Sequence, residues 1–337
     1  MKLSYYIIAI GLVCLHACSG CGNGNGPQPI DNTNGTSDTN TIVDVTVPDF
    51  VEDTAYQFVA KQVAFGPRVP NTPQHEACSQ WLQQTMKALA DTVYTQQVPV
   101  TAFNGKVLNC TNIIGAFNPN NPNRILLVAH WDSRPWADQD ADASNHDKPI
   151  LGANDGASGV GVLLEVARIL KANKVNIGVD LLLVDVEDYG KPGYENSYGL
   201  GSQYWAKNPH KSGYQAKFGI LLDMVGAPNS TFLLEANSMQ YAPDVLQKIW
   251  PLAIAKGYGQ YFQMIPGPAI DDDHVYINRY AGIKMVDIIH LSASSQSVFH
   301  PSWHTMQDNM QVIDKSTLNA VGQTLLEVIY REDKAVL

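Results

Sequence analysis

The sequence predicts a single globular α/β domain in which helices flank a central, mixed, mainly parallel and twisted sheet. Apolar runs typical of buried strands alternate with segments of helical periodicity through most of the chain. Such alternation is typical of parallel strands joined by helices that cover both faces of a sheet. The 337 residues are 45% hydrophobic and 16% charged, which is enough apolar material for one large core.

The acidic balance of the chain restricts its partners. The formal net charge is −10, and no basic stripe interrupts it. Proteins that bind nucleic acids neutralise phosphates with clustered lysine and arginine. The composition therefore argues against a nucleic-acid partner.

Residues 1–17 have the features of a secretory signal peptide. Lys2 precedes an apolar run that is too short to span a membrane comfortably. Leu15-His16-Ala17-Cys18 then resembles a bacterial lipobox, although His16 is unusual in one. We expect lipidation of Cys18 and a location in the bacterial cell envelope, in the periplasm or at the outer membrane. Cys21 is a weaker candidate for the lipid, and plain secretion is the alternative.

The remaining chain divides into a tether and one folded domain. Residues 18–46 are rich in Gly, Asn, Thr, Asp and Pro, which predicts a disordered segment. Residues 47–337 have globular composition and are predicted to form the catalytic domain. Cys78 and Cys110 lie in this domain, and export would permit a disulfide between them if they meet.

The domain is predicted to begin with two helices and two outer strands. Residues 53–64 and 73–90 have helical periodicity, and Pro73 follows Thr72 as a start signal. Residues 93–100 and 107–114 alternate loosely between apolar and polar side chains, as edge strands do.

Strand and helix then alternate to the end of the chain. Continuous apolar runs predict buried strands at residues 124–130, 179–185, 218–225, with 231–235 as a continuation, and 283–289. Apolar spacings of three and four predict helices at residues 156–173, 198–207, 242–256 and 315–331. We expect function in the long polar loops at residues 131–154, 186–197, 226–230, 259–274 and 290–308.

The segment 151–159 places the carboxylate of Asp155 among small residues, just before a predicted helix. Small residues let the backbone bend sharply and approach a ligand closely. The preceding strand delivers His130 and Asp132 to the same end of the sheet, where ligands bind in open α/β folds. The alternative role for Asp155 is a helix cap.

Acidic or imidazole side chains follow every buried strand. They are His130 and Asp132, then Asp185, Glu187 and Asp188, then Asp223, and finally His290 and His304. Carboxylates that converge at a buried sheet edge must be paired or bound to metal. Because Asp and His together suit zinc, the pattern predicts a zinc hydrolase or transferase.

Several short motifs resemble those of the zinc aminopeptidase (M28-like) superfamily with co-catalytic metals. They are His130-Trp131-Asp132, Gly152 to Ser158, Asp185 to Asp188, and Trp303-His304-Thr305. Within this superfamily the chain resembles the animal-type, zinc-dependent glutaminyl cyclases and their bacterial relatives over residues 50–330. The motifs that carry this closer resemblance are Leu221 to Pro228, Asp271 to His274, and Phe299 to Met306.

The resemblance implies the conversion of N-terminal glutamine on peptides and exported proteins to pyroglutamate, with release of ammonia. It implies a single zinc held by Asp155, Asp188 and His304. The remaining implied roles are Glu187 as general acid/base, Asp223 and Asp272 as an acidic network beside it, and Phe299 and Trp303 as walls of the substrate pocket. A monomer is the expected state.

Two departures from the animal pattern and two competing functions remain. Asp188 stands where animal enzymes carry Glu, and residues 189–198 lack the tryptophan that those enzymes place there. A two-zinc aminopeptidase would use His130 and Asp223 for a second ion, with Asp155 as the bridge. A binding protein on an inactivated hydrolase fold is disfavoured because the acid/base residue and the metal ligands are all present.

Overall fold

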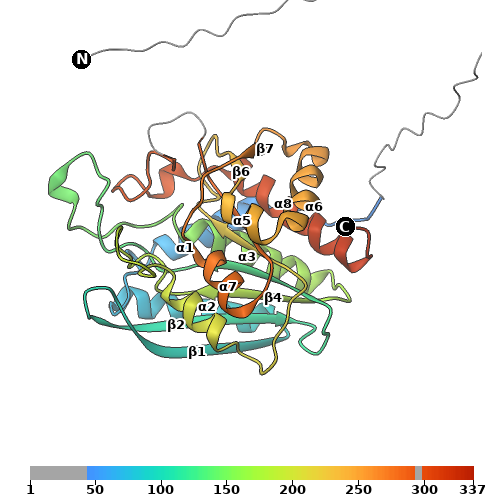
Figure 1. The fold of residues 1–337 in the computed structure, drawn as a ribbon, viewed down its shortest axis with the longest axis horizontal. Helices are drawn as coiled ribbons and strands as arrows, with labels where there is room; N and C mark the ends of the chain where they lie inside the picture. The colour runs from blue at the N-terminus through green and yellow to red at the C-terminus, as the bar shows by residue number, and fades with distance from the viewer. Residues whose placement is uncertain (1–43, 293–297) are drawn as a thin grey trace, which may run out of the picture. The chain divides into compact units, whose positions relative to one another are not determined.

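The structure is a computed structural model that describes residues 44–292 and 298–337 (Figure 1). The predicted signal peptide, the lipidation site at Cys18 and most of the predicted tether lie outside these residues. Within the described ranges, no helix is both long enough and apolar enough to cross a membrane.

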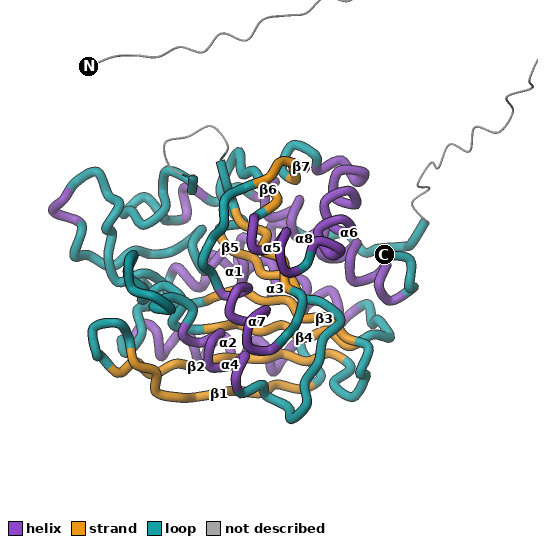
Figure 2. The backbone as a smooth tube through the Cα atoms, in the orientation of Figure 1, coloured by secondary structure: helices purple, strands orange, loops and turns teal. Residues whose placement is uncertain are grey.

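One six-stranded sheet organises the domain, with the strand order β1-β2-β4-β3-β5-β8 (Figures 1 and 2). The strands are β1 Thr92–Thr101, β2 Val107–Phe117, β3 Arg124–His130, β4 Gly178–Val184, β5 Gly219–Asp223 and β8 Met285–Ile289. The four strands from β4 to β8 in this order are parallel, and β1 and β2 add an antiparallel pair at one edge. The predicted mixed, mainly parallel sheet is confirmed.

Alternation along the central strands distributes apolar side chains to both faces of the sheet. In β3, Ile125 and Leu127 join the larger core, while Leu126 and Val128 join a second core on the other face. The helices of the larger core include α1 Glu52–Val63, α2 Pro73–Leu89, α3 Ala157–Ala172, α6 Pro243–Ala253 and α8 Lys315–Asp333. The second core is covered by α4 Leu200–Lys207 and α7 Asp273–Ala281. Both faces are therefore buried, which explains why these strands read as continuous apolar runs.

Three strand expectations were wrong in detail. β2 is an inner strand, because it pairs with β4 as well as with β1. Residues 231–235 do not continue β5, because Met224 adopts a left-handed backbone (φ 48°) that ends the strand. Instead β6 Phe232–Leu234 pairs with β7 Phe262–Pro266 in a separate two-stranded sheet, and β7 lies in a segment expected to be a loop.

The helical content of the C-terminal half also differs from the expectation. In place of one helix at 242–256, the chain forms α5 Ala236–Tyr241, α6 Pro243–Ala253 and a π turn at Ile254–Tyr258. Pro243 begins α6 because proline is well suited to the first helical turn. α7 was not predicted, since its aromatic and β-branched residues are weak helix formers. Two short 3₁₀ turns complete the fold at Ala143–Asn145 and Met310–Val312.

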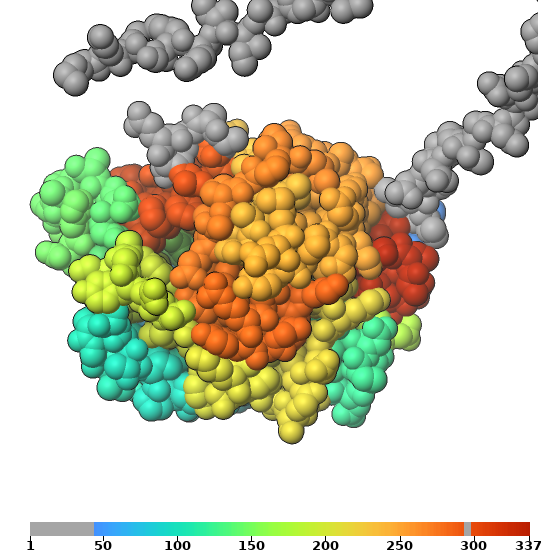
Figure 3. All heavy atoms as spheres, in the orientation of Figure 1, coloured from blue at the N-terminus to red at the C-terminus, as the bar shows by residue number. Residues whose placement is uncertain are grey.

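In the orientation of Figure 1, residues from the C-terminal half cover much of the visible surface (Figure 3).

The two cysteines of the folded domain lie in its interior and are not bonded to each other. Cys78 and Cys110 are both buried and free. Burial raises the pKa of the Cys78 thiol to about 12, so it stays protonated and unreactive at neutral pH.

Candidate active site

A cavity of about 360 Å³ opens at the carboxyl ends of the parallel strands, where ligands bind in such sheets. All eight candidate residues of the folded domain line it: Asp155, Glu187, Asp188, Asp223, Asp272, Phe299, Trp303 and His304. They come from loops after β3, β4 and β8, from the last residue of β5 and from the start of α7. The structure thus brings together residues that are up to 149 positions apart in the sequence, from Asp155 to His304.

Asp155, Asp188 and His304 form a compact, buried donor set. His304 Nε2 lies 3.3 Å from Asp188 Oδ1 and 3.7 Å from Asp155 Oδ2. One ligand atom from each residue lies within 4.8 Å of the others. Asp188 Oδ2 is buried without a hydrogen-bond partner, as expected of an oxygen that serves a cation. Two carboxylates and one imidazole suit zinc with one position left open.

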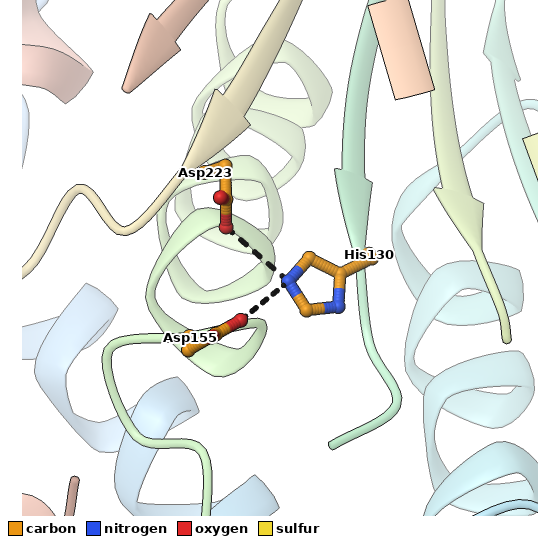
Figure 4. Close-up of side chains that lie close together, drawn as sticks. All are labelled: His130, Asp155 and Asp223. Carbon is orange, nitrogen blue, oxygen red and sulfur yellow. Dashed lines mark hydrogen bonds and ion pairs between the residues drawn. The ribbon is translucent and has the colours of Figure 1, made fainter. Parts of the chain in front are cut away.

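A second set, His130, Asp155 and Asp223, shares Asp155 with the first (Figure 4). His130, at the end of β3, points its Nε2 toward Asp155 Oδ1 at 3.0 Å and Asp223 Oδ1 at 3.2 Å. Its Nδ1 lies 3.4 Å from Asp132 Oδ1. Burial alone would lower the pKa of His130, but these three carboxylates outweigh it and raise that pKa well above its usual value. His130 does not line the cavity, whereas Asp155 and Asp223 do.

Asp132 fixes the backbone that carries the neighbouring acids. Its two carboxylate oxygens accept hydrogen bonds from the backbone N–H groups of Glu187 at 3.1 Å and Asp188 at 3.2 Å. Because Asp132 is fully buried, it is a fixed acceptor between β3 and the end of β4. The sequence identified Asp132 as a strand-end acid but not this role.

Arg134 connects two members of the donor set. Its guanidinium donates to Asp188 Oδ1 at 3.0 Å and forms a bidentate pair with Asp138 at 2.7 and 2.8 Å. Asp138 Oδ1 in turn lies 3.2 Å from His304 Nδ1. Burial alone would raise the pKa of Asp188, but His304 and Arg134 outweigh it and hold that pKa below its usual value. Neither Arg134 nor Asp138 stands in a pattern that marks it in the sequence.

Residues from distant parts of the chain hold the backbone around Asp155. Asp308 accepts the backbone N–H groups of Asn154 at 2.7 Å and Asp155 at 3.0 Å. The carbonyl groups of Leu151 and Gly152 accept hydrogen bonds from the buried guanidinium of Arg68. These contacts fix the segment before α3. In the sequence, this segment is marked by its small residues and not by the groups that hold it.

Three of the acids that face the cavity have raised pKa values. Burial, followed by the charge of Asp188, raises the pKa of Asp155 to about 6. Burial raises the pKa of Glu187 well above its usual value, and Asp188 and Asp272 add to the effect. Burial and the nearby Asp223 do the same to Asp272. A raised pKa is the property that a carboxyl needs to act as a general acid or base.

Aromatic side chains form one wall of the cavity. The rings of Phe299 and Trp303 lie 4.6 Å apart, and Trp303 stacks on His304 at 3.8 Å. Lys191, Tyr194 and Tyr198 also line the cavity, in the segment that lacks the tryptophan of the animal enzymes. Trp131 and His274 are structural: Trp131 donates to the Thr111 carbonyl, and His274 bonds Glu235 inside the core.

Comparison with known proteins agrees with this architecture. The model of peptidase family M28 matches residues 112–329. The crystal structure of Bacteroides thetaiotaomicron glutaminyl cyclase bound to N-acetylhistamine is 52% identical, covers 85% of this chain and 99% of that chain, and gives a TM-score of 0.82. A Zn-dependent exopeptidase from Parabacteroides distasonis is 49% identical, with the same coverage and a TM-score of 0.83.

A curated relative extends the similarity to animals. Glutaminyl-peptide cyclotransferase from Gloydius blomhoffii is 28% identical over 246 residues, which are 64% of this chain. They are 63% of that protein, so this chain spans less than two thirds of the relative's length. The resemblance seen in the sequence motifs is confirmed, and the chain belongs to peptidase family M28, in the group that contains the bacterial glutaminyl cyclases.

Proposed function

We propose that this protein is a zinc-dependent glutaminyl-peptide cyclotransferase, which converts N-terminal glutamine of peptides and proteins to pyroglutamate and releases ammonia. The observation that carries the proposal is the position of Glu187. The partly buried carboxyl of Glu187, whose pKa is raised, lines the same cavity as a zinc-type donor set and an aromatic wall. The identity to a bacterial glutaminyl cyclase over nearly its whole chain supports the same activity.

The proposed metal is one zinc ion, with Asp155, Asp188 and His304 as its ligands. All three line the cavity, so a metal held by them would face the substrate. Asp188 is shorter by one methylene than the Glu of the animal enzymes, and Arg134 fixes it by bonding Oδ1 while Oδ2 stays unpaired. His130 does not line the cavity, and its imidazole is paired with Asp132, Asp155 and Asp223.

The residues of the chain would then perform a ring closure. When bound, zinc supplies Lewis acidity toward the γ-carboxamide oxygen of the substrate glutamine. The α-amine of the same glutamine attacks its carboxamide carbon, so the reaction is intramolecular and depends chiefly on orientation. Glu187 takes one proton from the amine and returns it to the leaving nitrogen, which departs as ammonia.

Two further groups of residues would support this transfer. Asp223 and Asp272 would form an acidic network beside Glu187, in which burial and the charge of Asp223 raise the pKa of Asp272. Phe299 and Trp303 would hold the glutamine side chain against the metal and exclude water.

The direct test is product analysis on the zinc-loaded protein. A peptide that begins with Gln should lose ammonia and gain a blocked N-terminus, while the same peptide with an acetylated α-amine should not react. Hydrolysis of leucine amide serves as the peptidase control. Leucine release at a rate that rivals cyclisation would overturn the proposal.

A two-zinc aminopeptidase is the second candidate. It is favoured by the set His130, Asp155 and Asp223, whose ligand atoms also lie within 4.8 Å of one another. In that enzyme Glu187 would activate water instead of an amine. Zinc stoichiometry separates the two candidates, since the cyclase needs one ion and the peptidase two.

We also propose that the protein is exported and anchored by lipid on Cys18. The support is the signal-like run at residues 5–15 and the lipobox-like Leu15 to Cys18. Residues 18–46 would then act as a tether between the envelope and the domain. Exported proteins whose mature N-terminus is glutamine would be within reach of such an enzyme.

A further inference from the structure

A buried ion pair lies behind the turn that carries Glu187 and Asp188. His75, in α2, places Nε2 at 2.9 and 3.0 Å from the two carboxylate oxygens of Asp185. His75 is 4% exposed and Asp185 is fully buried, so water does not screen the pair. The imidazole stacks on Trp131 at 4.4 Å, which fixes the orientation of the ring. Neither residue lines the cavity.

The carboxylate of Asp185 also accepts hydrogen bonds from two backbone N–H groups. Oδ1 accepts the N–H of Val186 at 2.8 Å, and Oδ2 accepts the N–H of Thr111 at 2.6 Å. The carboxylate therefore ties the end of β4 both to β2 and to the next residue of its own chain. A carboxylate with this many fixed donors has one orientation only.

The turn that follows is strained. Val186 has φ 55°, in the left-handed region that a β-branched residue rarely adopts. The two residues after it are Glu187 and Asp188, so the direction of this turn decides where both carboxylates lie. A strained conformation persists only where surrounding contacts enforce it, and the Asp185 to Val186 hydrogen bond is such a contact.

We propose that His75 is a positioning residue for Glu187 and Asp188, because it holds Asp185 and thereby the left-handed turn at Val186. This inference rests on the proposed function for the roles of Glu187 and Asp188. The groups that face His75 are Asp185 and Trp131, with Asp132 and Glu76 contributing charge from further away. Loss of the imidazole leaves the Asp185 carboxylate held only by the N–H groups of Val186 and Thr111, and this weaker hold lets the turn relax away from the cavity.

The test compares His75→Leu, which removes the donor, with His75→Gln, which retains an N–H at the end of its side chain. His210→Leu is the matched control, because His210 also stacks on a tryptophan, Trp205, but belongs to a cluster near the start of β4. Zinc affinity is measured by chelator competition on folded protein, and kcat and KM on a peptide that begins with Gln.

We expect His75→Leu to weaken zinc binding and lower kcat by about 10- to 100-fold each, the usual effect of losing a residue that orients a metal ligand. His75→Gln should retain most of the zinc affinity and most of kcat. His210→Leu should change neither zinc affinity nor kcat. Unchanged zinc affinity and kcat in folded His75→Leu would overturn the proposal.

The decisive experiment uses Val186→Gly, since glycine adopts the left-handed conformation without strain. In that background His75→Leu should change zinc affinity much less than in the unmodified protein. An equal loss of zinc affinity in the Val186→Gly and the unmodified backgrounds would show that His75 does not act through the turn. Where His75→Leu alone fails to fold, the double variant is compared with Val186→Gly alone, and a 10- to 100-fold loss of zinc affinity there would overturn the proposal. Because this comparison reads zinc binding, it is independent of whether the protein cyclises glutamine.

Discussion

Glu187→Gln isolates the proposed proton transfer from every other property of the site. Glutamine has nearly the same size as glutamate and retains hydrogen bonding, but it cannot carry a proton between two nitrogens. The contacts that place residue 187 are made by its backbone, whose N–H bonds Asp132 and whose carbonyl accepts from Gly199 at 3.0 Å. The substitution should therefore leave the turn, Asp188 and the zinc content unchanged.

The expected loss is large and falls on turnover. Glu187 is enclosed by Asp188, Asp272 and Asp273, and burial with these charges gives its carboxyl a raised pKa suited to proton exchange. General acid–base catalysis by such a group contributes about 10²- to 10⁴-fold, which corresponds to about 3–5 kcal/mol of transition-state stabilisation. KM should change little, because the proton moves only in the transition state.

The assay measures zinc content and ammonia release from a peptide that begins with Gln. Glu165→Gln is the matched control, because Glu165 is also a glutamate inside the fold but pairs with Arg168 along α3, away from the cavity. Its turnover per folded molecule should equal that of the unmodified protein. Near-normal cyclisation by Glu187→Gln would refute Glu187 as the proton carrier.

Four further outcomes are expected. His304→Ala should lose zinc and all turnover, and full activity of the unmodified protein after thorough chelation would rule out metal catalysis. His130→Ala should retain its zinc if one ion is bound, whereas in a two-zinc peptidase the measured content should fall by about half. Cys18→Ser should move the protein from the membrane fraction to the soluble exported fraction, and unchanged membrane attachment would exclude the lipobox. Burial alone would raise the pKa of Glu235, but hydrogen bonds from His274 and the backbone outweigh it and hold the pKa at about 2, below its usual value of 4.5. Its contribution to the free energy of unfolding is therefore present above pH 4.5 and is lost as the pH falls toward 2. Unfolding of Glu235→Gln by denaturant should show a smaller loss of stability over that range than the unmodified protein.

The elements that the sequence predicted well are those with strong periodic signals. The run at 124–130 became β3 with the same bounds, and the helix expected at 156–173 became α3 at Ala157–Ala172. The failures lie where local signals are weak or where tertiary contacts decide. β7 exposes most of its side chains and depends on its pairing with β6, while α7 is built from residues with low helix propensity.

The residues of the candidate site also divide into those that the sequence predicts and those that it does not. Carboxylates and imidazoles at strand ends could be found because the topology of a parallel sheet brings strand ends together. The residues that hold them could not, since each contact joins positions without a shared pattern. Asp308 reaches Asn154 across 154 positions, and His75 reaches Asp185 across 110.

The backbone around the cavity explains why so many buried polar groups surround it. Val186, Met224 and His304 all have left-handed φ values of 48–55°, and each is itself a candidate site residue or lies next to one. A non-glycine residue in this region costs about 1–2 kcal/mol, so the three together cost about 3–6 kcal/mol. Domains are stable by only about 5–15 kcal/mol, so the site would relax without contacts that oppose it.

Hydrogen bonds at or directly after each strained residue provide these opposing contacts. Asp185 and Asp132 accept the N–H groups of residues 186–188, and the side chains of Ser158 and Asn154 accept those of residues 225 and 226. The carbonyl of His304 accepts the N–H of Gln139 at 3.1 Å. Loss of one such contact releases strain locally before it unfolds the domain. Substitutions in these buried acceptors should therefore reduce metal affinity and turnover more than they reduce global stability.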